Sequence, residues 1–168
     1  LFLAETLTGM VMRTYLRPEK EGITILASLM AFLPLILGAG GNSGSQVTSM
    51  VTRGLALGEI RPSDWLVTMR REIMTGVLTG IVLGLAGFIR ANLWHSSYQV
   101  CLIVGLALPL VILWAGTVGA VLPLCAKRLG IDPAVMSAPF ISTLVDATGL
   151  IIYFELARHI IGPSWNIQ

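Results

Sequence analysis

The chain has 168 residues, the length of one domain, and 55% of them are hydrophobic. Only 12% are charged, against about 25% in an ordinary soluble domain, so the charges are too few to cover a globular surface in water. The formal net charge of +2 is too small and too scattered to favour binding to nucleic acid, and we expect an all-α membrane protein in a lipid bilayer instead.

The apolar runs predict five transmembrane helices in a single membrane domain. A helix needs about 20 apolar residues to cross a hydrocarbon core of about 30 Å. The expected helices cover residues 1–16, 23–57, 70–91, 98–126 and 133–160. The first apolar run stops at Arg13, which is too short for a complete span, so we interpret it as the second half of a truncated helix.

The second expected helix contains a glycine-rich segment at 38–46, Gly-Ala-Gly-Gly-Asn-Ser-Gly-Ser-Gln. Four glycines and several polar side chains in a membrane helix predict an interruption, with irregular backbone that lines a wet cavity. The carbonyls of this segment, with the amides of Asn42 and Gln46, would then be ligands for an ion or water. A loop at the membrane surface, or close helix packing through small residues, is the alternative.

The third and fourth expected helices have the features of packing elements. Gly76, Gly80, Gly84 and Gly87 share one face of the third helix, as in a helix-packing seam. Pro109 predicts a kink or an interruption in the fourth. The connectors after the second and fourth helices hold slightly more basic residues than the connectors on the opposite side of the membrane. This bias favours a cytoplasmic location for these two connectors, and the N-terminus lies on the same side.

The fifth expected helix carries a carboxylate, Asp146, near the middle of the apolar run 134–154. An ionised carboxylate that faces lipid costs at least ~2.5 kcal/mol, so it should face protein, water or a cation. Ser142 and Gly149 share its helical face, and Thr143 lies beside them. Asp146 is therefore a candidate functional residue, and the alternative is a carboxylate that only hydrogen-bonds a neighbouring helix.

Three classes of function compete for this pattern. The first is a cation channel or transporter built on Asp146 and the segment 40–46. The second is an intramembrane aspartic protease, which needs two carboxylates that share a proton. No second Asp lies in mid-span, and Glu155 projects from another face near the membrane end, so we do not expect an enzyme. The third is a structural anchor, which would need neither feature.

A single carboxylate per chain provides too few ligands to coordinate a cation. Two-fold association, the commonest symmetry, would bring two copies of Asp146 to one axis. Two carboxylates suit a divalent ion that keeps its waters, and magnesium dehydrates reluctantly. Composition does not separate magnesium from calcium, sodium or a proton.

Two motifs together resemble the membrane domain of the MgtE family of magnesium channels. The first consists of Pro34 and the sequence Gly-Gly-Asn-Ser-Gly-Ser-Gln at 40–46. The second consists of Asp132-Pro133 followed by Pro139, Thr143, Asp146, Thr148 and Gly149. The resemblance covers essentially the whole chain, including the spacing of the spans.

The resemblance implies a homodimer with five helices per chain and a pore between the subunits, lined by the second and fifth helices. It implies that Asp146 faces a hydrated magnesium ion, which is the transported species, and that the Ser142 backbone carbonyl lines the pore. It also implies a cytoplasmic N-terminus in the cell membrane. The candidate pore-lining residues are Gly40, Gly41, Asn42, Gln46, Ala138, Thr143 and Gly149. Ala138 stands where some members of the family have Asn.

The resemblance leaves the transport mechanism and its regulation open. Bacterial members carry cytoplasmic magnesium-sensing domains before the first span, and we expect such domains in the full-length protein. Eukaryotic relatives are thought to be exchangers, so a divalent-cation exchanger coupled to sodium or protons, with the same Asp146 site, is the alternative to a channel. Glu5 is either a second ion site or a carboxylate near a truncated helix end.

Overall fold

The structure is a computed structural model that describes residues 23–162 of the chain. The first expected helix, over 1–16, and Glu5 lie outside the described residues. Between residues 23 and 162 the secondary structure consists of α-helices and short 3₁₀ turns, without a strand, which confirms the all-α class. The elements in order are α2 (Ile23–Ala31), α3 (Leu33–Leu57), η1 (Pro62–Asp64), α4 (Trp65–Leu93), α5 (Tyr98–Arg128), η2 (Pro133–Val135) and α6 (Ala138–Ile161).

Four segments of the described chain are long and apolar enough to cross a membrane, at residues 25–57, 62–93, 98–128 and 138–161. α4 begins at Trp65 rather than at residue 70, directly after η1. α6 begins at Ala138 rather than at residue 133, because residues 133–135 form the separate turn η2. The carboxylate of Asp132 stabilises that turn, since its Oδ1 accepts a hydrogen bond of 2.9 Å from the Ala134 backbone N–H.

The expected interruption of the second helix by the glycine-rich segment is wrong. α3 is a continuous helix from Leu33 to Leu57, and residues 38–46 lie inside it. The glycines allow close approach to other helices instead. A Cβ atom on Gly40 would lie 2.7 Å from Val111 Cγ1 of α5, and one on Gly44 would lie 3.1 Å from Ile141 Cγ2 of α6. The backbone groups therefore stay paired within the helix, and the small residues serve packing.

A break does occur in this span, but it lies nearer the N-terminus, at Phe32. α2 ends at Ala31 and α3 begins at Leu33, with Pro34 in its first turn. Proline has no N–H to donate and fits best in the first turn of a helix, so the hydrogen-bond ladder is interrupted there. The expected interruption at Pro109 does not occur, because α5 is one helix that contains both Pro109 and Pro123. The buried Tyr153 of α6 donates a hydrogen bond of 3.0 Å to the Leu29 carbonyl beside the break.

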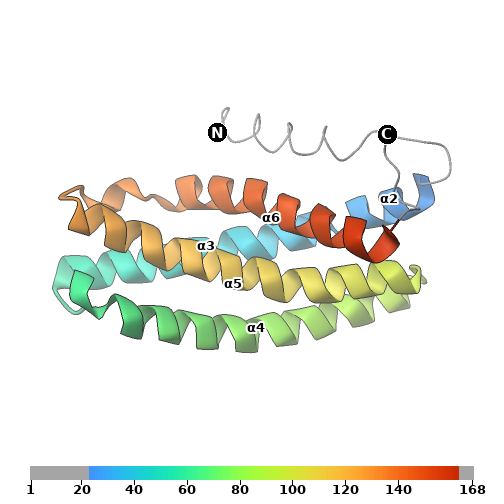
Figure 1. Ribbon diagram of the computed structural model, residues 1–168, viewed down its shortest axis with the longest axis horizontal. Coiled ribbons are helices and arrows are strands. Elements are labelled where there is room, and N and C mark those ends of the chain that lie inside the picture. Colours follow the sequence, from blue (N-terminus) through green and yellow to red (C-terminus); the bar gives the residue numbers. More distant parts are fainter. Residues whose placement is uncertain (1–22, 163–168) are drawn as a thin grey trace.

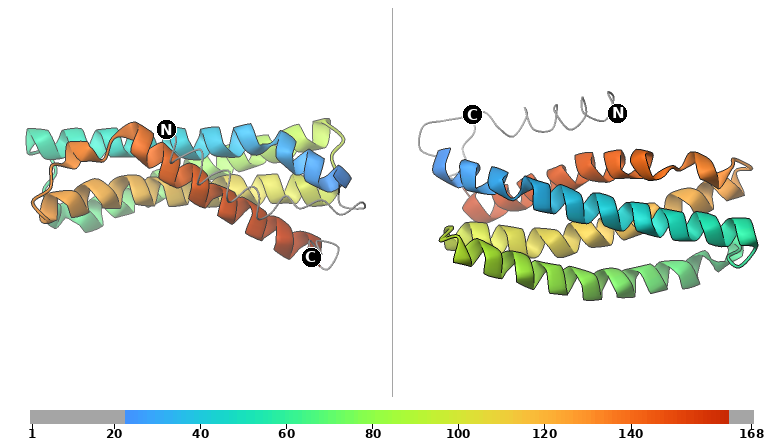
Figure 2. Two further views of the ribbon diagram at one scale, coloured as in Figure 1. Left: turned by 90° about the horizontal axis from the view of Figure 1, so that it is seen from above. Right: turned by 180° about the vertical axis from the view of Figure 1, so that it is seen from behind.

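α5 is the central helix of the described part, because α3, α4 and α6 all pack against it (Figure 1). α4 lies on one side of α5, and α3 and α6 lie on the other, where they also contact each other. Figure 2 shows α6 running obliquely across the other helices. The core follows α5 and includes the fully buried side chains of Val104, Leu108, Ile36 and Tyr153.

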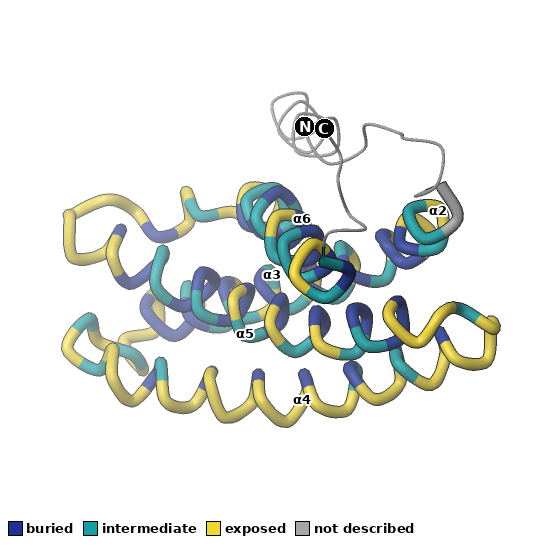
Figure 3. Tube along the Cα trace, turned by 45° about the vertical axis from the view of Figure 1, so that its right-hand side comes forward, coloured by how far each residue is buried: buried dark blue, intermediate teal, exposed yellow. Residues whose placement is uncertain are grey.

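α4 has one buried face and one exposed outer face (Figure 3). Gly76, Gly80, Gly84 and Gly87 are buried against α5, as the sequence predicts for a packing seam. A Cβ atom on Gly84 would lie only 2.6 Å from the Gly105 carbonyl oxygen. The opposite face exposes large apolar side chains, including 66% of Leu78, which is the surface that a membrane-spanning helix presents to lipid.

Candidate cation site

The carboxylate of Asp146 lies between α6 and α3. A Cβ atom placed on Gly41 of α3 would be 3.1 Å from Asp146 Oδ1, so the carboxylate rests against the α3 backbone. Oδ1 is buried, and no described residue donates a hydrogen bond to it. A buried carboxylate oxygen without a donor is unfavourable unless a cation, water or another group interacts with it.

Two hydroxyl groups join α3 to α6 one turn away from Asp146. Ser45 Oγ and Ser142 Oγ lie 2.8 Å apart and share a hydrogen bond. Ser45 Oγ also lies 3.2 Å from the Ala138 carbonyl oxygen, and Ser142 Oγ lies 3.4 Å from the Gly41 carbonyl oxygen. Each hydroxyl has one hydrogen, so one of the two serines shares its hydrogen between its carbonyl and the other hydroxyl. The structure therefore brings Gly41, Ala138, Ser142 and Asp146 together, and adds Ser45, which the sequence patterns did not single out.

A row of exposed polar residues runs along α3 from the level of Asp146. Asn42, Gln46, Ser49 and Arg53 are all exposed and recur every three or four residues, so they project from one face of the helix. We call these four residues the polar stripe. Towards the start of α3 the exposed residues include Pro34 and Gly38, which are not polar. The polar half of the exposed surface thus extends from the Asp146 level to the end of α3.

Two of the expected pore-lining glycines lie in a different environment. Gly40 and Gly149 are buried, and a Cβ atom on either would contact Val111 of α5, at 2.7 Å and 3.3 Å respectively. Their positions favour a role in helix packing. Thr143 is half-buried, and its hydroxyl donates to the Pro139 carbonyl at 2.8 Å within the same helix.

Thr148, part of the sequence motif around Asp146, links α6 to α5. Its hydroxyl oxygen accepts a hydrogen bond of 2.7 Å from Trp114 Nε1 and donates to the Leu144 carbonyl at 2.7 Å. The hydroxyl is therefore committed to contacts within the chain, which fix α6 beside α5.

Glu72 is a buried carboxylate-bearing residue of the membrane-spanning segments that the sequence patterns did not single out. It is only 6% exposed and lies in α4, on the face that packs against α5. Its position four residues before Gly76 continues the buried glycine face, and that spacing is the signal that would have revealed it.

The described residues contain no group of three or more His, Cys, Asp or Glu side chains that could enclose a metal ion. A cation near Asp146 would therefore meet one carboxylate per chain, and would need water or a second chain to complete its coordination.

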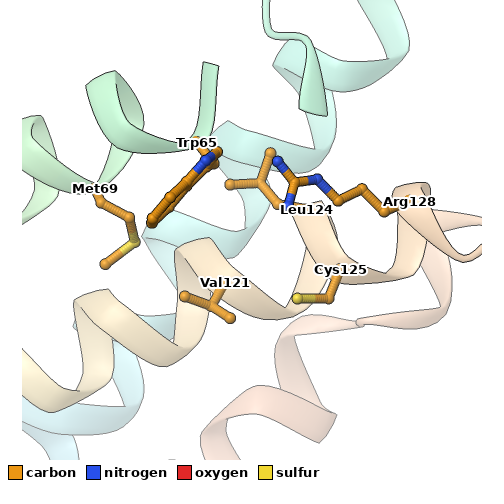
Figure 4. A pocket seen from close by; sticks show the side chains of 6 residues that line it. All are labelled: Trp65, Met69, Val121, Leu124, Cys125 and Arg128. Atoms are coloured by element: carbon orange, nitrogen blue, oxygen red, sulfur yellow. The ribbon is translucent and has the colours of Figure 1, made fainter. Parts of the chain in front are cut away.

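A small cavity lies elsewhere, between the start of α4 and the end of α5 (Figure 4). Its volume is about 60 Å³, and it is lined by Trp65, Met69, Val121, Leu124, Cys125 and Arg128. The lining contains no carboxylate, and Arg128 Nη2 donates a hydrogen bond of 2.7 Å to the Pro62 carbonyl of η1. Arg128 thus connects the end of α5 to the turn before α4, and the cavity is no candidate for a cation site.

Comparison with known proteins identifies the family of this chain. The family model MgtE, described as a divalent cation transporter, matches residues 33–156. The "Magnesium transporter MgtE" of Thermus thermophilus is 36% identical over 152 residues, which are 90% of this chain and 34% of that protein. The protein of the same name from Enterococcus faecalis is 36% identical over 138 residues, 82% of this chain and 30% of that protein.

A third relative, the "Magnesium transporter MgtE" of Bacillus subtilis, is 28% identical over 149 residues, 89% of this chain and 33% of that protein. The chain spans about a third of the length of these curated relatives. The matched region includes all of α3 and residues 138–156 of α6, and therefore Asp146 and the residues Gly41, Ser45 and Ser142 around it. With its long apolar helices, this chain is a multi-pass membrane protein and belongs to the MgtE family of divalent cation transporters.

Proposed function

We propose that this chain is the membrane-spanning part of a homodimeric magnesium channel, in which Asp146 of both subunits holds a hydrated Mg²⁺ ion. The observation that carries the proposal is the buried Oδ1 of Asp146, which has no hydrogen-bond donor among the described residues. Asp146 is only half-buried, so the accessible part of the same side chain can meet a divalent cation or a water molecule bound to it, which would offset the cost of that burial. The relatives named as magnesium transporters support Mg²⁺ as the cation.

The polar stripe supports a pore beside this carboxylate. Amide and guanidinium groups that face hydrocarbon lose their hydrogen bonds to water, so an exposed polar row on a membrane helix favours contact with water or protein. Asn42 and Gln46 would line the path on α3, with Gly41 beside the carboxylate, and Ala138 and Thr143 would line it on α6. The Ser142 carbonyl would face the same path.

The number of carboxylates supports the dimer. One Asp146 per chain leaves a divalent ion short of negative charge, whereas a two-fold axis supplies two. Magnesium keeps several waters and is usually held by one or two carboxylates. The two copies would therefore hold the hydrated ion through its waters, and would select it by the size and charge of the hydrate.

The distribution of basic residues supports a cytoplasmic location for the end of the bundle where α3 and α5 end. Within residues 23–162 this end carries Arg53, Arg61, Arg70, Arg71, Lys127 and Arg128, and the opposite end carries Arg90 and Arg158. Cytoplasmic segments are enriched in Lys and Arg. If the expected helix over 1–16 also crosses the cell membrane, the N-terminus would lie on this cytoplasmic side. The relatives are longer than this chain, which leaves room in the full-length protein for the cytoplasmic magnesium-sensing domains that the resemblance implies.

The proposal is tested by removing the carboxylate in the intact protein. Asp146→Ala should reduce Mg²⁺ uptake into liposomes by about tenfold or more, because it removes both carboxylates that attract the hydrated ion, and a loss of about 1.4 kcal/mol is already tenfold. Asp146→Glu keeps the charge on a longer side chain, so it should retain uptake with an altered preference between Mg²⁺ and Ca²⁺.

Glu59→Ala is the matched control, because Glu59 is an exposed carboxylate in the connector after α3. Normal uptake in Asp146→Ala would contradict the proposed site. Uptake that requires a sodium or proton gradient would replace the channel by the coupled exchanger at the same site.

A further inference from the structure

We infer that Gly41 is a positioning residue: its lack of a side chain sets how far the Asp146 carboxylate extends towards the cation, and with it the selectivity of the site. The inference rests on the proposed function of Asp146. It starts from one contact between α3 and α6, where a Cβ atom on Gly41 would meet Asp146 Oδ1 at 3.1 Å. Carbon and oxygen atoms that are not bonded to each other rarely approach so closely, so a methyl group there would displace a neighbour.

The neighbour that moves is the carboxylate. The next atoms around the added methyl are Ser142 Oγ and Cβ, at 3.5 Å and 3.6 Å, which are ordinary contact distances. Ser142 is also held in place by its 2.8 Å hydrogen bond to Ser45. Asp146 Oδ1, in contrast, has no hydrogen bond to a described residue that would resist its rotation. The strain would therefore be relieved by a change of the Asp146 side-chain torsions.

The direction of this movement follows from the packing around it. The methyl would occupy the space next to the α3 backbone, so the carboxylate would turn away from α3. Val145, the preceding residue, is 1% exposed and fills the contact with α3 on its side, so it leaves no room there. The carboxylate would extend towards the open side of α6. At a contact of 3.1 Å the carboxylate has to give way by a few tenths of an ångström, and for an ion held through its waters a displaced carboxylate alters the fit, as misplaced groups do in other preorganised sites.

The glycines of α3 provide matched controls, because they differ in what an added methyl would meet. On Gly38 it would find no atom within 4 Å. On Gly40 it would press against the side chains of Val111 and Val145, at 2.7 Å and 3.1 Å. The same Gly→Ala substitution on one helix therefore has three different neighbours. The added methyl meets open space at Gly38, apolar side chains at Gly40 and the carboxylate at Gly41.

The first test compares these three variants in the intact protein, reconstituted in liposomes. The measurements are the half-saturating Mg²⁺ concentration and the ratio of Mg²⁺ to Ca²⁺ uptake. Gly41→Ala should change them by roughly twofold to a hundredfold, the range of coupling between residues in contact. Gly38→Ala should change neither. Gly40→Ala should lower the melting temperature, and in the folded fraction it should change the half-saturation and the ion ratio less than Gly41→Ala does, because its tightest contact is with Val111 of α5.

The second test needs no transport and remains informative if Gly41→Ala is poorly folded. The melting temperature is measured for Gly41→Ala alone and combined with Asp146→Ala. Truncation of the carboxylate removes the clash, so the loss caused by Gly41→Ala should largely disappear, whereas the loss caused by Gly40→Ala should persist. A loss from Gly41→Ala that is the same in both backgrounds would overturn the inference.

The two tests separate this inference from the proposed function. If Asp146→Ala abolishes uptake but Gly41→Ala has normal half-saturation and ion preference, the inference is wrong and the cation site stands. If Asp146→Ala itself transports normally, the proposed function fails together with the inference, whatever the melting temperatures show.

Discussion

Tyr153 shows how one hydroxyl group stabilises the least regular part of the described chain. Its side chain is fully buried in α6, and its hydroxyl donates to the Leu29 carbonyl at 3.0 Å. The same carbonyl accepts from the Phe32 N–H at 3.1 Å, in the tighter pattern of a 3₁₀ turn. Tyr153 therefore fixes α2 to α6 where the hydrogen-bond ladder of the span is interrupted.

Removal of this hydroxyl should lower the stability of the protein. Tyr153→Phe keeps the ring but leaves one buried hydrogen bond unmade, at a cost of about 1 kcal/mol. For a domain of this size the melting temperature should fall by about 2–4 °C. Tyr98→Phe is the control, because Tyr98 is 70% exposed and its hydroxyl has no hydrogen bond to a described residue. Equal melting temperatures for Tyr153→Phe and Tyr98→Phe would show that the bond contributes nothing.

Single residues were predictable from the sequence where their chemistry contrasts with their neighbours. Asp146 stands out as a charge inside an apolar run, and that contrast needs no knowledge of other helices. The contact of its carboxylate with Gly41 depends on how α6 is placed along α3, and so does the bond between Ser45 and Ser142. The spacing of residues within one helix does not determine the placement of two helices relative to each other, so these contacts were not predictable.

α3 combines two surfaces that the sequence pattern mixes together. Its glycines at 40, 41 and 44 are buried against α5 and α6, and the polar stripe is exposed on another face. Judged by composition alone, the glycines and polar residues of 38–46 predict irregular backbone. Separated by helical periodicity, they form a packing face and a polar face on a continuous helix. The true break follows the simpler rule that a proline marks the first turn of a new helix.

The polar stripe should be in contact with water if it lines the proposed pore. In a background with Cys101 and Cys125 replaced, Asn42→Cys and Gln46→Cys should react with a charged, membrane-impermeant thiol reagent. Leu78→Cys, on the lipid-facing side of α4, is the control and should react much more slowly, because the thiolate that reacts does not form in hydrocarbon. The measurement is the labelling rate by mass spectrometry. Reaction at Leu78 as fast as at Gln46 would argue against a wet path along α3.

At the scale of the whole molecule, the two sides of α5 are covered differently. α4 covers one side and presents an apolar face outward, whereas on the other side Asp146 is half-buried between α3 and α6 and the polar stripe is exposed. In the proposed dimer this second side faces its own copy, since a two-fold interface uses the same patch on both subunits.

Cross-linking tests this arrangement directly. Asn42→Cys, with the native cysteines replaced, should give a covalent dimer with a short bifunctional thiol reagent, because the two-fold axis places each Asn42 opposite its copy. Ser142 is a less suitable position for the cysteine, since its hydroxyl forms a hydrogen bond with Ser45 of the same subunit. Leu78→Cys is the control on the outer face of α4. Dimers linked through Leu78 but never through Asn42, or transport by a monomer, would exclude the pore at the two-fold axis.

The close packing of α4 on α5 has a consequence for the biosynthesis of the protein. The two helices are joined by the turn at 94–97 and are in contact from Gly76 to Gly87, so their interface is local in sequence. Such a hairpin completes its packing once both helices have entered the bilayer. Ser45 and Ser142, in contrast, are separated by 97 positions and meet only after α6 has been synthesised. The surroundings of Asp146 are thus assembled after the hairpin of α4 and α5, and translation that stops after α5 leaves an inserted chain without the proposed cation site.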